Sequence, residues 1–138
     1  MHIKHVNIRD LNPLHRSSLK IWPTSLQENS KAFEILKHGD LGCPDDASLN
    51  AIELNPGAVY PAHAHDQPEF YYVLKGQAKM TWGDDTFIAS SGSAIYTPPG
   101  VGHRVEAIGE EPFVALVFWW APGGDKEAIG RNYRFLGD

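Results

Sequence analysis

The chain is poor in cysteine and has no long apolar run. Its 138 residues include one cysteine, Cys43, so no internal disulfide can form and nothing requires an oxidising compartment. No segment approaches the ~20 apolar residues of a membrane-spanning helix. The first five residues precede no apolar run, so we expect no secretory signal. These absences predict a cytoplasmic location. We also expect Cys43 to be an inert loop thiol.

Basic side chains are also in the minority. The chain has 12 lysines and arginines against 17 aspartates and glutamates, which gives a net charge of −5 and a pI near 5.7. Nucleic acids and anionic membranes both attract basic surfaces. We therefore expect neither a nucleic acid nor a membrane as a partner.

Repeats, low-complexity segments and linkers are absent as well, and 138 residues suit one domain. The apolar residues follow a period of two, in short segments about ten residues apart. Turn residues such as Asn55-Pro56-Gly57 and Pro98-Pro99-Gly100 separate them. The pattern predicts an all-β sandwich or barrel with strands at 32–36, 49–54, 69–74, 77–82, 86–89, 94–97, 103–107 and 113–120.

The first 30 residues are less regular, so we expect an N-terminal arm over 1–30 and a single barrel domain over 31–138. Pro13 and Pro23 leave room for at most one helical turn, over 14–21. Apolar side chains such as Ile3 and Trp22 could dock on a second subunit or on the arm's own barrel.

Two spaced motifs collect candidate metal ligands. The first reads Gly57, five residues, His63, one residue, His65, three residues, Glu69, six residues and a final glycine. His63 and His65 are two apart, so in an extended segment both point to one face. The second motif runs from Gly92 and ends with His103.

Between Gly92 and His103, the second motif reads five residues, Pro98, one residue, Gly100 and two residues. Three imidazoles and one carboxylate suit one divalent transition metal such as Fe, Mn, Zn, Ni, Co or Cu, with positions left open on one side. The absence of a thiolate ligand argues against a structural zinc site. The other histidines, His2, His5, His15 and His38, are interpreted as surface or packing residues.

Residues beside Glu69 are candidates for the chemistry. Alternation places Tyr71 on the same strand face as Glu69, where a phenol near a cation has a lowered pKa and could act as a general base. The alternative is that Tyr71 packs or orients a ligand. The same rule turns Arg104 away from the metal. Further pocket candidates are Tyr60, Met80, Trp82, Tyr96, Trp119 and Trp120.

Both motifs match the two signatures of the cupin superfamily, which this chain resembles over about 51–120. The resemblance implies a double-stranded β-helix, or jelly-roll barrel, with His63, His65, Glu69 and His103 as metal ligands. Ala107 departs from the pattern, because cupins often have Asn there. Small cupins commonly pair, which implies a homodimer.

Within cupins, the order His63, His65, Glu69, Tyr71, His103 is similar to that of the dimethylsulfoniopropionate lyases. That resemblance implies Tyr71 as the base that removes a proton next to a metal-bound carboxylate. We therefore expect a metal-dependent lyase acting on a small polar organic molecule. The alternatives are an iron-dependent dioxygenase and a non-enzymatic metal- or sugar-binding cupin.

Overall fold

The computed structural model describes residues 3–14, 23–128 and 130–137. The strands in these ranges are β1 (Ser30–Leu36), β2 (Ala47–Leu54), β3 (Val59–Ala64), β4 (Glu69–Lys75), β5 (Gln77–Trp82), β6 (Asp85–Ala89), β7 (Ala94–Thr97), β8 (His103–Ile108), β9 (Phe113–Trp120) and β10 (Arg134–Phe135). The short helices are η1 (Ile8–Asp10), α1 (Thr24–Glu28), η3 (Pro122–Gly124) and η4 (Lys126–Ala128). None of these helices is long and apolar enough to cross a bilayer.

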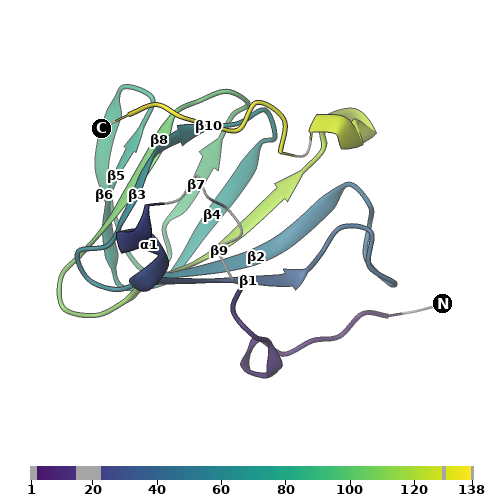
Figure 1. Cartoon of the computed structure of the whole chain (residues 1–138), viewed down its shortest axis with the longest axis horizontal. Coiled ribbons are helices and arrows are strands. Elements are labelled where there is room, and N and C mark those ends of the chain that lie inside the picture. The colour runs from purple at the N-terminus through teal and green to yellow at the C-terminus, as the bar shows by residue number, and fades with distance from the viewer. Residues whose placement is uncertain (1–2, 15–22, 129, 138) are drawn as a thin grey trace.

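The strands form two five-stranded sheets, one with the order β1-β2-β9-β4-β7 and one with the order β10-β3-β8-β5-β6. Every strand pair is antiparallel. The chain passes between the sheets repeatedly, so that late strands lie between early ones (Figure 1). This arrangement confirms the predicted all-β, double-stranded β-helix.

Eight of the ten strands coincide with predicted segments to within two residues at each end. The two others, β3 and β10, have weak sequence signals. β3 contains Pro61, and its pairing with β8 is irregular between Tyr60 and His63, so simple alternation is lost. β10 has only two residues. Helix α1 was also not predicted.

Alternation along β4 divides its side chains between the interior and the solvent. Glu69, Tyr71 and Val73 are at most 5% exposed, whereas Phe70 and Tyr72 are 46% and 49% exposed. The predicted placement of Tyr71 on the inner face with Glu69 is therefore confirmed.

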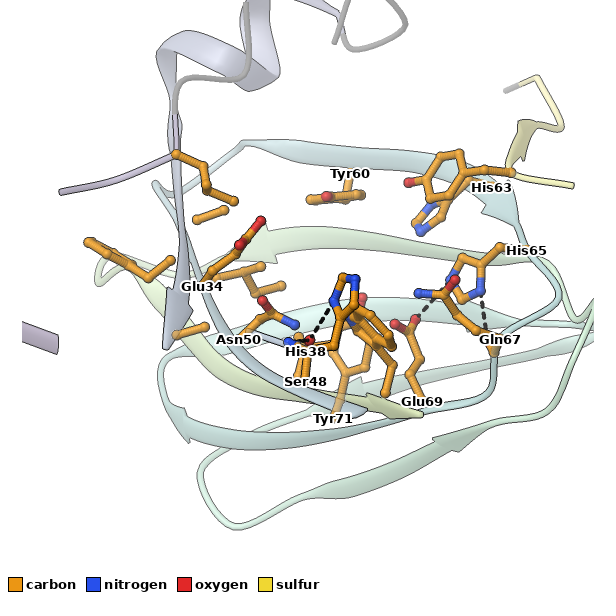
Figure 2. Close-up of a pocket in the computed structure, with 18 residues that line it drawn as sticks. Glu34, His38, Ser48, Asn50, Tyr60, His63, His65, Gln67, Glu69 and Tyr71 are labelled. Atoms are coloured by element: carbon orange, nitrogen blue, oxygen red, sulfur yellow. Dashed lines mark hydrogen bonds and ion pairs between the residues drawn. The ribbon is translucent and has the colours of Figure 1, made fainter. Parts of the chain in front are cut away.

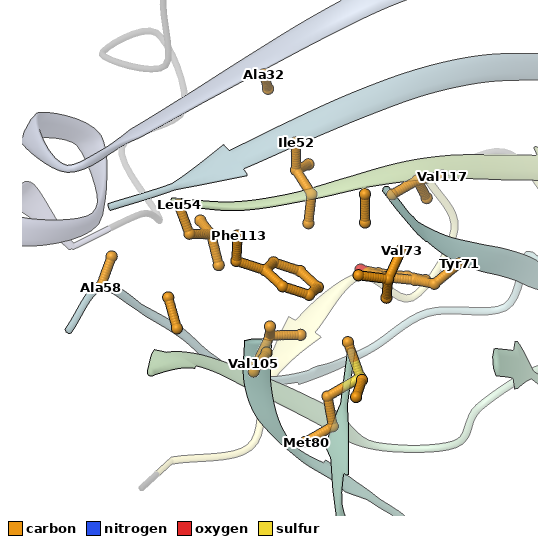
Figure 3. Packing of buried hydrophobic residues seen from close by; sticks show 14 of the residues in the cluster. Ala32, Ile52, Leu54, Ala58, Tyr71, Val73, Met80, Val105, Phe113 and Val117 are labelled. Atoms are coloured by element: carbon orange, nitrogen blue, oxygen red, sulfur yellow. The ribbon is translucent and has the colours of Figure 1, made fainter. Parts of the chain in front are cut away.

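The hydrophobic core fills the space between the two sheets. Leu54, Val73, Met80, Val105 and Phe113 are completely buried and come from five different strands (Figure 3). Each such side chain contributes about 1.5–3 kcal/mol by its removal from water. These buried contacts hold the two sheets together.

Gly76, the last residue of the first motif, is required by the backbone. Its φ is +78°, and a Cβ atom there would lie 2.4 Å from the carbonyl oxygen of Pro112. Glycine adopts this conformation without strain and allows the close approach of the two segments.

The described part of the N-terminal arm contacts its own barrel. Lys4 Nζ lies 3.9 Å from Asp40, and the N–H of Leu14 donates to the carbonyl of Ala32 at 2.7 Å. Trp22 and most of the possible helical turn over 14–21 lie outside the described residues.

Candidate metal centre

The predicted ligand residues come from both sheets. His63 lies near the end of β3, directly opposite His103 at the start of β8. His65 follows β3, and the N–H of Gly100 donates to its carbonyl at 2.8 Å, so the two sequence motifs are joined. Glu69 begins β4 in the other sheet. All four side chains are at most 5% exposed, and the centre lies between the sheets.

Backbone carbonyl groups orient the three imidazoles. The Nδ1 atoms of His63, His65 and His103 lie 2.7, 2.7 and 3.0 Å from carbonyl oxygens two residues away along the chain. A carbonyl can only accept, so each Nδ1 carries the proton and each Nε2 presents its lone pair. This is the tautomer and orientation that a metal-ligating histidine needs.

Glu69 lies beside two of the three clustered histidines. One ring nitrogen of each histidine lies within 4.8 Å of the others. Glu69 Oε1 lies 3.3 Å from His65 Nε2 and 2.9 Å from His103 Nε2. Even so, Glu69 Oε1 and His103 Nε2 have no hydrogen-bond partner among the described residues.

Unpartnered buried polar atoms are costly, and a cation between them would remove that cost. The donor set is also one that divalent transition metals accept. The residues present therefore fit a metal ion.

The charges of the centre also suit a cation. Burial raises the pKa of Glu69, but the imidazoles of His103 and His65 outweigh it and lower this pKa to about 2. Burial and the neighbouring His103 lower the pKa of His63 to about 3. Burial lowers the pKa of His65 too, yet the carboxylate of Glu69 raises it more, so the net shift is upward. At neutral pH the centre therefore holds an ionised Glu69 and a neutral His63.

A cavity of about 230 Å³ opens beside this centre (Figure 2). Aromatic side chains supply much of its wall, and none of its described lining residues is a lysine or an arginine. The lining residues are Leu14, Ala32, Phe33, Glu34, His38, Ser48, Asn50, Ala51, Ile52, Tyr60, His63, His65, Gln67, Glu69, Tyr71, Val117, Trp119 and Tyr133.

Tyr71 is among the residues that border both the cavity and the centre. Its ring packs edge-on against His103, with ring centroids 6.4 Å apart, and against Trp82 at 5.4 Å. Trp82 is a packing residue, because its indole N–H donates to Thr97 Oγ1 at 2.7 Å inside the barrel.

The other aromatic candidates divide between the cavity, the core and the surface. Of the pocket candidates, Tyr60 and Trp119 line the cavity. Met80 lies in the core, and Tyr96 is 49% exposed, so neither is a cavity residue. Trp120 stacks on Phe70, with ring centroids 5.0 Å apart. Arg104 lies 3.3 Å from Glu106 and does not line the cavity.

Sequence reasoning missed most of the residues that line the cavity, including Tyr133 and His38. Tyr133 stacks on both His63 and His65, with ring centroids 5.5 Å away in each case. His38, interpreted above as a surface or packing residue, packs against Trp119 and also lines the cavity. Neither follows a motif or a period, because tertiary contacts alone bring them to the site.

The segment that carries Tyr133 is fixed to the loop between His65 and Glu69. Arg131 Nε donates to Asp66 Oδ2 at 2.6 Å, and the N–H of Asp66 donates to the carbonyl of Arg131 at 3.0 Å. The guanidinium lowers the pKa of Asp66. The N–H of Gly130 also donates to Gln67 Oε1. These contacts hold the Tyr133 ring over the histidines.

Comparison with known proteins agrees with the fold. Residues 50–119 match the family model of the cupin domain, a range that contains both motifs and all four predicted ligands. The chain belongs to the cupin family. The resemblance noted in the sequence is therefore confirmed.

Several curated proteins are similar to this cupin. An uncharacterized protein of Methanocaldococcus jannaschii is 36% identical over 75% of this chain and 82% of its own length. The oxalate decarboxylase of Bacillus subtilis is 38% identical, over 47% of this chain and 18% of its own length. The dimethylsulfoniopropionate lyase of Ruegeria pomeroyi is 29% identical, over 54% of this chain and 37% of its own length. The matches to these two enzymes therefore span only a minor part of each.

Solved structures share the fold of this cupin. The crystal structure of the Ruegeria pomeroyi lyase superposes with a TM-score of 0.63 at 22% identity, covering 75% of this chain and 52% of the lyase. The cupin domain of Schizosaccharomyces pombe Cnp3 gives a TM-score of 0.68 at 14% identity, covering 92% of this chain and 80% of that domain.

Proposed function

We propose that this cupin is a metal-dependent enzyme that acts on a small polar organic molecule. One divalent transition metal per chain would be held by His63, His65, Glu69 and His103. The observation that carries this proposal is the pair of buried, unpartnered atoms, Glu69 Oε1 and His103 Nε2, 2.9 Å apart in a centre with two further imidazoles. The aromatic cavity beside the centre supplies a place for the substrate.

The reaction that we favour is an elimination. When bound, the metal would anchor a carboxylate or carbonyl group and acidify the carbon next to it. Tyr71, in its phenolate form, would take the proton from that carbon through Oη. The electrons of the broken C–H bond would then form a C=C bond, and the leaving group would depart with the electron pair of its own bond. Support comes from the burial of Tyr71 beside His103 and from the partial likeness to the lyase.

A second candidate is an iron-dependent dioxygenase. The observation that favours it is the cavity on one side of three histidines and one carboxylate, which leaves space for both a substrate and oxygen. In this reaction Tyr71 would act only by packing. The two candidates therefore differ in their need for oxygen and for the Tyr71 hydroxyl.

The test measures how activity depends on the Tyr71 hydroxyl and on oxygen. Under elimination, Tyr71→Phe retains its metal and loses kcat by about 100-fold or more, since only the base is removed. The matched control is Tyr72→Phe on the outer face of the same strand, which should keep full activity. Assays would use small carboxylates that bear a leaving group, with and without oxygen. Turnover that requires oxygen, with a mild effect of Tyr71→Phe, would contradict elimination and support the dioxygenase.

We also propose that the protein forms a homodimer through the outer face of the sheet that contains β4. Phe70, Tyr72, Tyr96 and Phe118 are 39–49% exposed on this face, and the rings of Phe70 and Tyr96 are 5.3 Å apart. Leu74 is exposed as well, and about half of the surface of each of these five side chains is accessible to solvent. The accessible area of the five is on the order of 400 Å² in total. A patch of this size could form the core of a standard interface of about 800 Å² per copy.

Sedimentation would test the dimer. The wild type should sediment at twice its chain mass of 15.3 kDa, and Phe70→Lys should shift it toward the monomer. Ile88→Lys is the control, because Ile88 is 55% exposed but lies on the other sheet. A wild type that remains monomeric at micromolar concentration, or an equal effect of both variants, would contradict this interface.

A further inference from the structure

The cavity contains a histidine that the metal centre does not use. His38 follows β1, and its backbone N–H donates to the hydroxyl of Ser48 at 2.9 Å. Its Nδ1 lies 3.3 Å from the same hydroxyl, and its ring packs against Trp119 with centroids 5.2 Å apart. Ser48 itself is 3% exposed. The His38 ring is thus held from two sides, by one buried hydroxyl and one indole.

The sheet register shows where His38 lies relative to the metal centre. Ser48 on β2 and Glu69 on β4 are both paired with Trp119 on β9, one from each side. Residues in one such row point to the same face, and neighbouring strands are about 4.8 Å apart. The backbones of Ser48 and Glu69 are therefore roughly 10 Å apart, with Trp119 between them. In Figure 2 the His38 ring lies between Asn50 and Glu69.

The chemistry of this end of the cavity limits what can bind there. Among the described lining residues no lysine or arginine is present, and the nearby ionised group is Glu34, whose carboxylate lies 4.0 Å from the Nζ of Lys37. Among the described lining residues a phosphate or a second carboxylate would find no cation, because Lys37 pairs with Glu34 and is not part of the wall. The volume of about 230 Å³ admits only a small molecule. A neutral hydrogen-bonding group is what this end can accept.

We propose that His38 determines substrate specificity by hydrogen bonding, through Nε2, the neutral polar end of a molecule whose carboxylate lies at the metal centre. This inference rests on the proposed function of that centre. The Ser48 hydroxyl can donate to Nδ1 or accept from Nδ1–H, so Nε2 is able to donate or to accept. Ser48 is then a positioning residue. The ligand class is a short carboxylate with a hydroxyl or amide group several bonds away.

The experiment compares two probes that differ by one hydroxyl group. 4-Hydroxybutanoate and butanoate are titrated into the full-length protein loaded with Co²⁺, and binding is followed by calorimetry and by the visible absorption of the metal. The hydroxyl of this probe is too far from its carboxylate to favour chelation. We expect 4-hydroxybutanoate to bind wild type about 5-fold more tightly than butanoate does, as one net hydrogen bond allows.

Variants then assign that gain to a residue. His38→Ala should abolish the 5-fold ratio while leaving butanoate affinity and Co²⁺ content unchanged, and Ser48→Ala should reduce the ratio. His5→Ala, on the exposed arm, and Asn50→Ala, in the same cavity wall, should retain it.

The outcomes separate the two proposals. A wild type that binds butanoate but shows a ratio near one, a ratio that survives His38→Ala, or a ratio lost only in Asn50→Ala would overturn the role of His38 and leave the metal centre intact. A wild type that binds no Co²⁺ or no carboxylate would overturn the proposed function, and the inference with it.

Discussion

The two ends of the barrel interior are equally buried but use opposite chemistry. At one end Phe113 and Leu54 are fully buried, and at the other Glu69 and His103 are 5% and 1% exposed. Removal from water stabilises the apolar pair, whereas it penalises an ionised carboxylate and an imidazole nitrogen without a hydrogen-bond partner. Strand β4 connects the ends, from Glu69 to Val73 within five residues. The comparison teaches that the apolar end carries the stability, and that the polar end has the composition expected of the proposed metal centre.

The largest effect on stability that we predict comes from a substitution in the apolar end. Phe113→Ala should lower the free energy of unfolding by about 3–5 kcal/mol, because a completely buried ring leaves a cavity behind. Phe118→Ala, on the outer face of the same strand and 39% exposed, should cost less than about 1 kcal/mol. Urea denaturation of both variants measures the difference. Similar losses would mean that burial does not distinguish these positions.

A smaller effect is expected from the polar end. A divalent metal at 100 times its Kd should raise the free energy of unfolding of the wild type by about 2.7 kcal/mol. His63→Ala combined with His65→Ala should show no such rise, since only two ligands remain. With a chelator present, the double variant should be at least as stable as the wild type. Thermal melts measured without metal would contradict this view if the melting temperature of the double variant lay well below that of the wild type.

The pH dependence of metal affinity sharpens the comparison further. The carboxylate of Glu69 raises the pKa of His65 above its ordinary value, so this histidine keeps its proton to a higher pH. His63 and Glu69, with pKa values of about 3 and 2, have already lost theirs. Between pH 5 and the pKa of His65, affinity should therefore rise by at least about tenfold per pH unit, which is 1.4 kcal/mol, and then level off.

The metal-free protein should instead show a stability maximum near the unfolded-state pKa of histidine. Below that pKa, stability falls as the pH falls, because the unfolded chain binds a proton at His63 that the folded chain, with its His63 pKa of about 3, does not. The ion pair between protonated His65 and Glu69 contributes its full stability below the unfolded-state pKa of histidine, and this contribution is lost as the pH rises through the raised pKa of His65. Competition with a coloured chelator and urea denaturation, each across pH 5–9, measure the two trends. An affinity independent of pH would contradict the role of His65.

The strands and the candidate ligands were predictable because both follow local rules. Alternation placed Tyr71 with Glu69, and the motif spacing identified the three histidines that the fold brings together. His38 and Tyr133 were not predictable, since each reaches the cavity through tertiary contacts, His38 through Ser48 and Tyr133 through its fixed segment. β3 escaped prediction because a proline and irregular pairing disrupt its period.

The most direct test of the metal centre is its stoichiometry. Equilibrium dialysis of the chelator-treated wild type against Co²⁺ or Mn²⁺, followed by elemental analysis, should give one ion per chain. The variant with both His63→Ala and His65→Ala should give none, at an unchanged circular dichroism spectrum. A wild type that binds no divalent ion, or a double variant that keeps one per chain, would contradict the assignment of the polar end as a metal centre.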